Sequence, residues 1–195
     1  MSRRPAALRR AVFLDRDGTL HVERDFCRRA QDIEVLPGVR EALEALRAAG
    51  FALVVVTNQS GIARGLLDEI TLSGIHDELQ RQLGGCIDAF FHCPHHPSEG
   101  SGPYTRTCTC RKPASGLFHD AAAILGLAFE GSWVIGDSAR DLLAAPEPVR
   151  GILVCSGKPP EDGLRELRSL GRAPDAVAPD LKAAARIVLG MSPTD

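Results

Sequence analysis

The chain has 195 residues, of which 44% are hydrophobic and 25% are charged, and its formal net charge is −2. These values are ordinary for a globular protein and exclude an intrinsically disordered chain, and the length suits one α/β domain rather than two. A charge this close to zero offers no overall attraction to nucleic acid or to an anionic membrane. Since no apolar run is long enough to span a bilayer, we expect a cytoplasmic protein without a nucleic-acid or membrane partner.

Short aliphatic and β-branched runs alternate along the chain with stretches of helical periodicity. The runs predict strands at residues 11–14, 51–56, 87–91, 133–135, 151–154 and 176–178. The stretches between them predict helices at residues 37–50, 67–83, 115–125, 139–145, 161–170 and 181–189. This alternation favours a doubly wound, Rossmann-like parallel sheet in one α/β domain over residues 1–190, with a loose tail at 191–195. In such sheets, ligands bind beyond the carboxyl ends of the strands.

The first strand ends in the run Asp15-Arg16-Asp17-Gly18-Thr19. Two carboxylates two residues apart can share a divalent cation, while one attacks phosphorus and the other transfers protons. Gly18 allows the backbone to turn sharply beneath a phosphate. Taken alone, the motif fits an acidic strand-to-loop turn equally well, whereas a calcium loop is a poor fit because Gly18 comes too early.

The second strand is followed by Thr57-Asn58-Gln59-Ser60-Gly61. A hydroxyl, an amide and exposed backbone N–H groups ahead of a helix suit the oxygens of a phosphate. In isolation, an ordinary capping turn explains the same residues.

Cysteine and histidine gather after the third strand, in a long polar loop at about residues 92–112. Cys93-Pro-His95-His96-Pro97 is followed by Cys108-Thr-Cys110. Three thiolates and one imidazole satisfy tetrahedral zinc, and a closed set of four ligands is typical of a structural site. His95 is the expected nitrogen ligand, with His92 and His96 as alternatives. The other interpretation is a polar loop with free buried cysteines. Cys27, Cys86 and Cys155 have no partners at such spacing, and we interpret them as packing residues.

Two further polar signals follow in the chain. Lys112, in Arg111-Lys112-Pro113, could neutralise a carboxylate nucleophile and an incoming phosphate, although a lysine is usually a solvated charge. Asp137 follows the fourth strand and suits magnesium, and Asp141 lies one helical turn later on the same face. The alternative is that Asp137 or Ser138 caps the next helix.

These motifs, in this order, resemble the haloacid dehalogenase superfamily of phosphohydrolases over nearly the whole chain. The resemblance implies that Asp15 forms an aspartyl-phosphate, that Asp17 protonates the leaving oxygen and then activates water, and that Thr57 and Lys112 hold the phosphoryl group. It also implies that Mg²⁺ binds to Asp15, Asp137 and the backbone carbonyl of Asp17. Only short connections separate Gly18 from Thr57, so we expect no large cap domain.

The cysteine loop, together with the complete run Ser60-Gly-Ile-Ala-Arg64-Gly, is similar to the heptose bisphosphate phosphatases of that superfamily. The histidinol-phosphate phosphatases share the loop but typically lack this run, and they or other sugar-phosphate phosphatases are the alternative. The resemblance implies loss of the C7 phosphate from a heptose 1,7-bisphosphate, in the synthesis of nucleotide-activated heptose. It also implies that five residues contact the small phosphorylated sugar: Asn58, Gln59, Ser60, Arg64 and Arg111.

The chain departs from this family at two positions. His21 stands where the family usually has asparagine, and Ser138 stands where it often has a basic residue, so both could alter substrate choice. A polynucleotide phosphatase is disfavoured because no basic stripe with aromatic residues is present. A zinc-based interaction module on an inactive scaffold is disfavoured by the complete set of expected catalytic residues. Nothing in the sequence demands a partner, so we expect a monomer.

Overall fold

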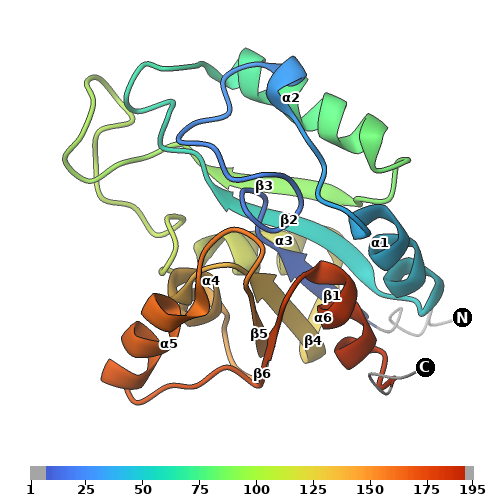
Figure 1. The fold of residues 1–195 in the computed structure, drawn as a ribbon. Coiled ribbons are helices and arrows are strands. Elements are labelled where there is room, and N and C mark those ends of the chain that lie inside the picture. Colours follow the sequence, from blue (N-terminus) through green and yellow to red (C-terminus); the bar gives the residue numbers. More distant parts are fainter. Residues whose placement is uncertain (1–7, 192–195) are drawn as a thin grey trace, which may run out of the picture.

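The fold is a parallel sheet of six strands in the order β3-β2-β1-β4-β5-β6 (Figure 1). The computed structural model describes residues 8–191. All five strand pairings are parallel, which confirms the predicted doubly wound sheet. The strands are β1 (Arg9–Leu14), β2 (Ala52–Asn58), β3 (Ala89–Cys93), β4 (Leu127–Gly136), β5 (Arg150–Val154) and β6 (Ala176–Ala178).

Helices cover both faces of this sheet (Figure 1). They are η1 (Ala30–Asp32), α1 (Val39–Ala48), α2 (Glu69–Gln82), α3 (Gly116–Leu125), α4 (Ala139–Ala144), α5 (Pro160–Ser169) and α6 (Leu181–Val188). Alternate residues of β1 enter different cores: Val12 and Leu14 pack with α1, α2 and α6, and Ala11 and Phe13 pack with α3, α4 and α5. Because side chains alternate across a strand, a strand buried on both faces is a continuous apolar run, as the sequence indicates.

Most predicted elements lie within two residues of the observed ones, and the third strand is shifted. β3 begins at Ala89 rather than Ile87, so His92 and Cys93 are its last residues instead of following it. Thr57 and Asn58 likewise end β2, since parallel pairing with β3 extends through them. The short helix η1 was not predicted.

The fourth strand is longer than predicted because it contains an irregularity. Its pairing with β1 shifts in register between Arg10 and Val12. The side chain of Ser132, which is fully buried, replaces the backbone partners that the register shift removes. Its Oγ accepts a hydrogen bond from the Ala11 N–H at 2.8 Å and donates one to the Ala128 carbonyl at 2.6 Å. The apolar run at 133–135 is therefore only the final part of β4.

The sheet order places the candidate site. From β1 the chain moves to β2 and β3 on one side of the sheet and then returns to β4 on the other side of β1, so the carboxyl ends of β1 and β4 form a topological switch point. Between Gly18 and Thr57 the chain contains only η1, α1 and loops, so no large cap domain is inserted there.

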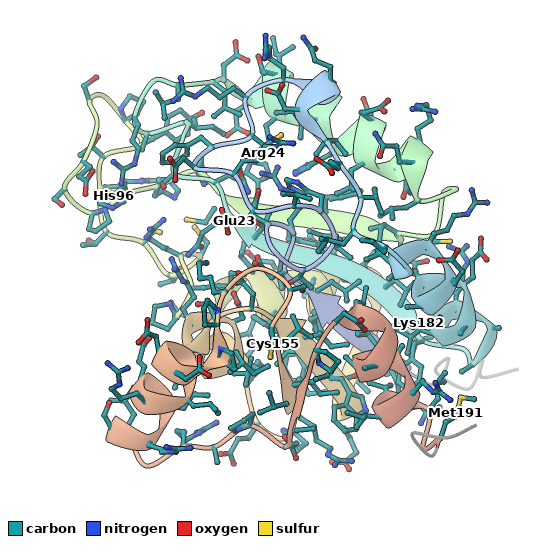
Figure 2. All side chains as sticks on the ribbon, in the orientation of Figure 1. Glu23, Arg24, His96, Cys155, Lys182 and Met191 are labelled. Atoms are coloured by element: carbon teal, nitrogen blue, oxygen red, sulfur yellow. The ribbon has the colours of Figure 1, made fainter. Side chains whose placement is uncertain are left out.

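The described residues end at Met191, beside the end of α6 at the edge of the molecule (Figure 2). Most of the expected tail, residues 192–195, lies outside the described part of the chain. Among residues 8–191, no helix combines the length and apolar character that a membrane crossing requires.

Candidate active site and cysteine cluster

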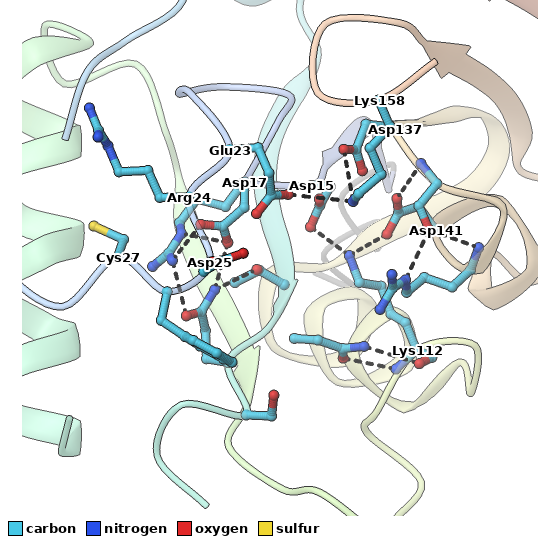
Figure 3. A pocket seen from close by; sticks show the side chains of 18 of the residues that line it. Asp15, Asp17, Glu23, Arg24, Asp25, Cys27, Lys112, Asp137, Asp141 and Lys158 are labelled. Atoms are coloured by element: carbon cyan, nitrogen blue, oxygen red, sulfur yellow. Dashed lines mark hydrogen bonds and ion pairs between the residues drawn. The ribbon is translucent and has the colours of Figure 1, made fainter. Parts of the chain in front are cut away.

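A buried lysine lies between two aspartates at the base of the site (Figure 3). The Lys112 Nζ is 2.7 Å from Asp15 Oδ1 and 2.6 Å from Asp141 Oδ1, and it also donates to the Val56 carbonyl at 2.7 Å. Burial lowers the pKa of Lys112, but the charges of Asp141 and Asp15 outweigh it and raise this pKa. The ammonium therefore stays charged although its side chain is only 1% exposed.

Asp15, Asp137 and Asp141 each offer an oxygen, and these oxygens lie within 4.8 Å of one another. Burial, followed by the charge of Asp141, raises the pKa of Asp15 to about 6. Burial, followed by the charge of Asp15, raises the pKa of Asp137 to about 6. Gly18 packs so closely that an added Cβ would lie 2.4 Å from Asp137 Oδ2. Both oxygens of Asp141 are engaged, Oδ1 by Lys112 and Oδ2 by the Ser138 N–H, whereas Asp15 contacts Lys112 through Oδ1 alone. The pair Asp15 and Asp137 is therefore the one that fits a hard cation such as Mg²⁺.

The second aspartate of the first motif is bound by three neighbours. Asp17 Oδ1 accepts from Arg16 at 2.8 Å and lies 3.0 Å from His21 Nε2, and its Oδ2 accepts from Gln59 Nε2 at 2.9 Å. Burial raises the pKa of Asp17, but the charge of Arg16 and the contact with His21 hold this pKa well below its usual range. The carboxyl group of Asp17 is therefore ionised in this arrangement.

Behind Asp17 lies a buried arginine that the sequence reasoning did not identify. The side chain of Arg16 is 1% exposed, and its Nη1 is 3.4 Å from Nε2 of His76 on α2. Burial, and then the charge of Arg16, lowers the pKa of His76 to about 3, so this ring is neutral and can accept from Arg16. Nothing local in the sequence marks Arg16 as buried, because two of its partners, Gln59 just after β2 and His76 on α2, are distant in the chain.

The expected substrate-binding residues all line one cavity of about 260 Å³ together with the aspartates. The Asn58 amide makes two hydrogen bonds of 3.0 Å with the backbone of Lys112, and the Gln59 amide bonds to Asp17 and Thr57. Arg64 forms an ion pair with Glu99. In this structure, Asn58 and Gln59 therefore hold other site residues in place.

The cysteine loop forms a compact four-ligand cluster. The three sulfur atoms of Cys93, Cys108 and Cys110 lie 3.2 to 3.6 Å apart, and His95 Nδ1 is 3.3 Å from the sulfur of Cys110. This donor set and its spacing fit a tetrahedral zinc ion.

The two alternative histidines make other contacts. His92 lies 2.7 Å from Glu69, and the His96 ring accepts from the backbone N–H of Glu99 at 2.8 Å, on the outer loop (Figure 2). The structure therefore selects His95. Cys27, Cys86 and Cys155 lie outside this cluster, and the first two are buried.

The cluster is joined to the active site through the chain that follows it. Arg111 Nη1 donates to the His95 carbonyl at 3.1 Å, and Lys112 is the next residue. The four-ligand cluster at residues 93–110 thus positions the side chains of Arg111 and Lys112. Lys158, which the sequence reasoning missed, approaches from the loop after β5, where its Nζ lies 3.2 Å from Asp137 and 3.4 Å from Glu23.

Comparison with known proteins identifies the family. Residues 12–83 match the haloacid dehalogenase-like hydrolases, and residues 109–184 match the HAD-hydrolase-like family. A protein of Photorhabdus laumondii named D-glycero-beta-D-manno-heptose-1,7-bisphosphate 7-phosphatase is 41% identical over 154 residues, 76% of this chain and 82% of the relative. A protein of the same name from Vibrio cholerae is 42% identical, over 76% of this chain and 83% of that protein. This chain belongs to the haloacid dehalogenase-like hydrolases.

Solved structures of this family share the fold. The D,D-heptose 1,7-bisphosphate phosphatase of B. bronchiseptica, complexed with magnesium and phosphate, has a TM-score of 0.77 and 37% identity, over 93% of this chain and 98% of that chain. The enzyme of Burkholderia thailandensis has a TM-score of 0.63 and 33% identity, over 92% of this chain and 98% of that chain. The chain is thus a phosphatase of the haloacid dehalogenase-like family, and Asp15 and Asp137 provide oxygens suited to its magnesium.

Proposed function

We propose that this phosphatase removes the C7 phosphate of D-glycero-D-manno-heptose 1,7-bisphosphate, in the synthesis of nucleotide-activated heptose. The observation that supports this proposal best is the composition of one cavity. Asp15, Asp137 and Lys112 lie at its base, and Arg64 and Arg111 also line it. Arginines beside a phosphatase centre suit a substrate with a second phosphate. The names of the relatives at 41% and 42% identity support the same substrate. We further propose that the enzyme acts as a monomer, since a single chain supplies every residue that lines the cavity. We also propose that it acts in the cytoplasm.

In the first half of the reaction, a carboxylate oxygen of Asp15 attacks phosphorus, and the bond from phosphorus to the sugar oxygen breaks. Asp17, in its protonated form, donates a proton to the sugar oxygen. Lys112 and Thr57 bind the phosphoryl oxygens. In the second half, Asp17 takes a proton from water as the water attacks phosphorus, and the Asp15–phosphorus bond breaks to release phosphate.

Asp15, Asp137 and the backbone carbonyl of Asp17 would hold magnesium, which would supply positive charge against the phosphoryl oxygens. The residues around it prepare the nucleophile. The pKa values of Asp15 and Asp137 are both about 6, so part of each carboxyl group is protonated just below neutral pH. A nearby cation lowers the pKa of Asp15 and so favours the ionised form that attacks phosphorus. Lys112 acts in the same direction through its 2.7 Å contact with Asp15.

Asp17 has to change partners during the reaction. Arg16, His21 and Gln59 hold its carboxyl group ionised, and an ionised carboxylate cannot donate a proton. Donation therefore requires the Asp17 side chain to leave these contacts, take up a proton from solvent and turn toward the sugar oxygen. The arrangement described here suits a resting state, in which Arg16, His21 and Gln59 keep Asp17 ionised.

The test is a side-by-side steady-state assay with magnesium. The substrates are both anomers of heptose 1,7-bisphosphate, histidinol phosphate and fructose 1,6-bisphosphate. We expect the largest kcat/KM for one heptose anomer, with release of one phosphate per sugar, and the preferred anomer defines the pathway. A flat profile, or a preference for histidinol phosphate, would reject the heptose substrate while leaving the phosphatase chemistry intact.

A further inference from the structure

Seven cationic side chains line the cavity, and five of them have a carboxylate partner. The paired ones are Arg16, Arg24, Arg64, Lys112 and Lys158. Within residues 8–191, the remaining two, Arg111 and Arg140, form no ion pair with a carboxylate. These two arginines are therefore the cavity's uncompensated positive charges.

Arg140 is held at the cavity by Ser138, the N-cap residue of α4. It lies in the first turn of α4, and its Nε donates to the Ser138 hydroxyl at 2.9 Å. Ser138 is itself fixed, because its backbone N–H donates to Asp141 Oδ2 at 3.1 Å. Since Nε is engaged, the two terminal nitrogens of Arg140 are the ones that can bind a ligand.

Arg111 and Arg140 are close enough to affect each other electrostatically. Burial lowers the pKa of Arg111; the charge of Cys93 acts against burial, and the charge of Arg140 acts with it. Arg111 makes one neutral contact, from Nη1 to the His95 carbonyl, which leaves its other donors for a ligand. Two like charges without a carboxylate partner at one cavity repel each other, and a bound dianion offsets this repulsion with charge-assisted hydrogen bonds.

We propose that Arg140, held by Ser138, joins Arg111 in binding the phosphate group of the substrate that is not hydrolysed. The proposal rests on the proposed function, because it requires a substrate with two phosphates. It makes Arg140 a specificity-determining residue, which selects bisphosphates over monophosphates. It also gives Ser138, one of the two departures from the family pattern, a positioning role.

The test compares two substrates that differ only in the second phosphate: heptose 1,7-bisphosphate and heptose 7-phosphate. Arg140→Ala should lower kcat/KM for the bisphosphate by roughly 10-fold to 100-fold, mainly through KM, as expected for a lost hydrogen bond to a charged group. The value for the monophosphate should stay within about 2-fold, since that substrate makes no contact with Arg140. Arg140→Lys should retain part of the selectivity, and Arg40→Ala, on α1 outside the cavity, should change neither value.

A second variant tests whether the charge itself is what matters. Ser138 also lines the cavity, so Ser138→Lys in the Arg140→Ala background should restore a cation beside Arg111 and recover part of the bisphosphate selectivity. Inhibition by the product, heptose 1-phosphate, should weaken in Arg140→Ala and return in the double variant.

The outcomes separate this proposal from the proposed substrate. Equal losses on the two heptose substrates, or no loss on the bisphosphate, would overturn the role of Arg140. If the wild-type enzyme instead prefers fructose 1,6-bisphosphate, the same comparison is made against fructose 6-phosphate. If Arg140 is needed for the preference for fructose 1,6-bisphosphate over fructose 6-phosphate, the role of Arg140 is supported and the heptose substrate is rejected. A wild-type enzyme that favours no bisphosphate over its monophosphate would reject both.

Discussion

At the scale of single residues, the site is governed by an imbalance of buried charge. Asp15, Asp137 and Asp141 bring three carboxyl groups together, and buried Lys112 contacts two of them, Asp15 and Asp141. Repulsion and burial together raise the pKa of both Asp15 and Asp137 to about 6. A divalent cation relieves this imbalance, so the same charges that destabilise the site without metal create its affinity for metal.

The nucleophile is tested by Asp15→Asn. The amide oxygen can still accept from Lys112, so the fold should be retained, but the amide is a much poorer nucleophile than the carboxylate. We expect hydrolysis to fall by more than roughly 10³-fold, as for removal of an essential nucleophile, with unchanged circular dichroism and zinc content. Asp77→Asn, an exposed change of the same kind on α2, is the control. Activity retained in Asp15→Asn would reject Asp15 as the nucleophile.

At the scale of elements, two irregular segments support the regular sheet. The bulged pairing of β4 with β1 is completed by the side chain of Ser132, and the loop after β3 is closed by the cluster of cysteines and His95. Each segment ends close to a catalytic residue: β1 leads to Asp15, and the loop leads to Lys112. The positions of these two residues therefore depend on contacts that lie outside the cavity.

The role of the bulge is tested by Ser132→Ala. The substitution leaves the buried Ala11 N–H and Ala128 carbonyl without partners, which should lower the free energy of unfolding by about 1–3 kcal/mol. The measurement is urea unfolding followed by circular dichroism. Ser169→Ala is the control, because the exposed hydroxyl of Ser169 contacts only the Glu166 carbonyl and water can replace it. Equal midpoints for the two variants would contradict this role.

The cysteine cluster is tested by Cys108→Ser. The variant should lose most of the bound zinc, and the loop should become more sensitive to protease because the metal closes it. Activity should fall as well, since Arg111 and Lys112 directly follow the cluster. Cys155→Ser is the matched control, because Cys155 lies outside the cluster. Zinc well below one per chain in freshly purified, unchelated wild-type protein would contradict the site.

At the scale of the whole molecule, the raised pKa values couple stability to pH and to magnesium. Between about pH 4 and pH 6, the folded protein keeps protons on Asp15 and Asp137 that the unfolded chain has released. These two groups therefore make the metal-free protein less stable as pH rises through this window. Magnesium binds the ionised carboxylates and should reverse the loss at neutral pH.

We accordingly expect magnesium chloride to raise Tm more at about pH 7.5 than at about pH 5, because protons compete with the metal at the lower pH. The measurement is thermal unfolding with potassium chloride at matched ionic strength as the reference. Asp137→Asn, which removes one metal ligand, should abolish most of the magnesium-dependent gain. An equal gain at both pH values would contradict the coupling.

The sequence by itself determined the strand-and-helix alternation, the doubly wound sheet and the members of the cysteine cluster. It could do so because these features depend on local patterns, namely continuous apolar runs, helical periodicity and ligand pairs spaced by one residue. The parallel direction of the strands then followed, since alternating strands and helices have few permitted arrangements, but the strand order was not predicted. The ends of β3 and β4 were misplaced, because pairing with a neighbouring strand extends each beyond its apolar run.

Only the tertiary structure decided which polar groups meet. Lys112 reaches Asp15 across 97 positions of sequence, and Arg16 reaches Gln59 across 43. No local pattern encodes such contacts, because packing of the sheet against its helices sets the distances between them. For the same reason, the sequence could name Asn58 and Gln59 as candidate ligands but could not show that other site residues already engage their amides. That Arg140 lacks a carboxylate partner in the described part of the chain is likewise a property of the folded molecule.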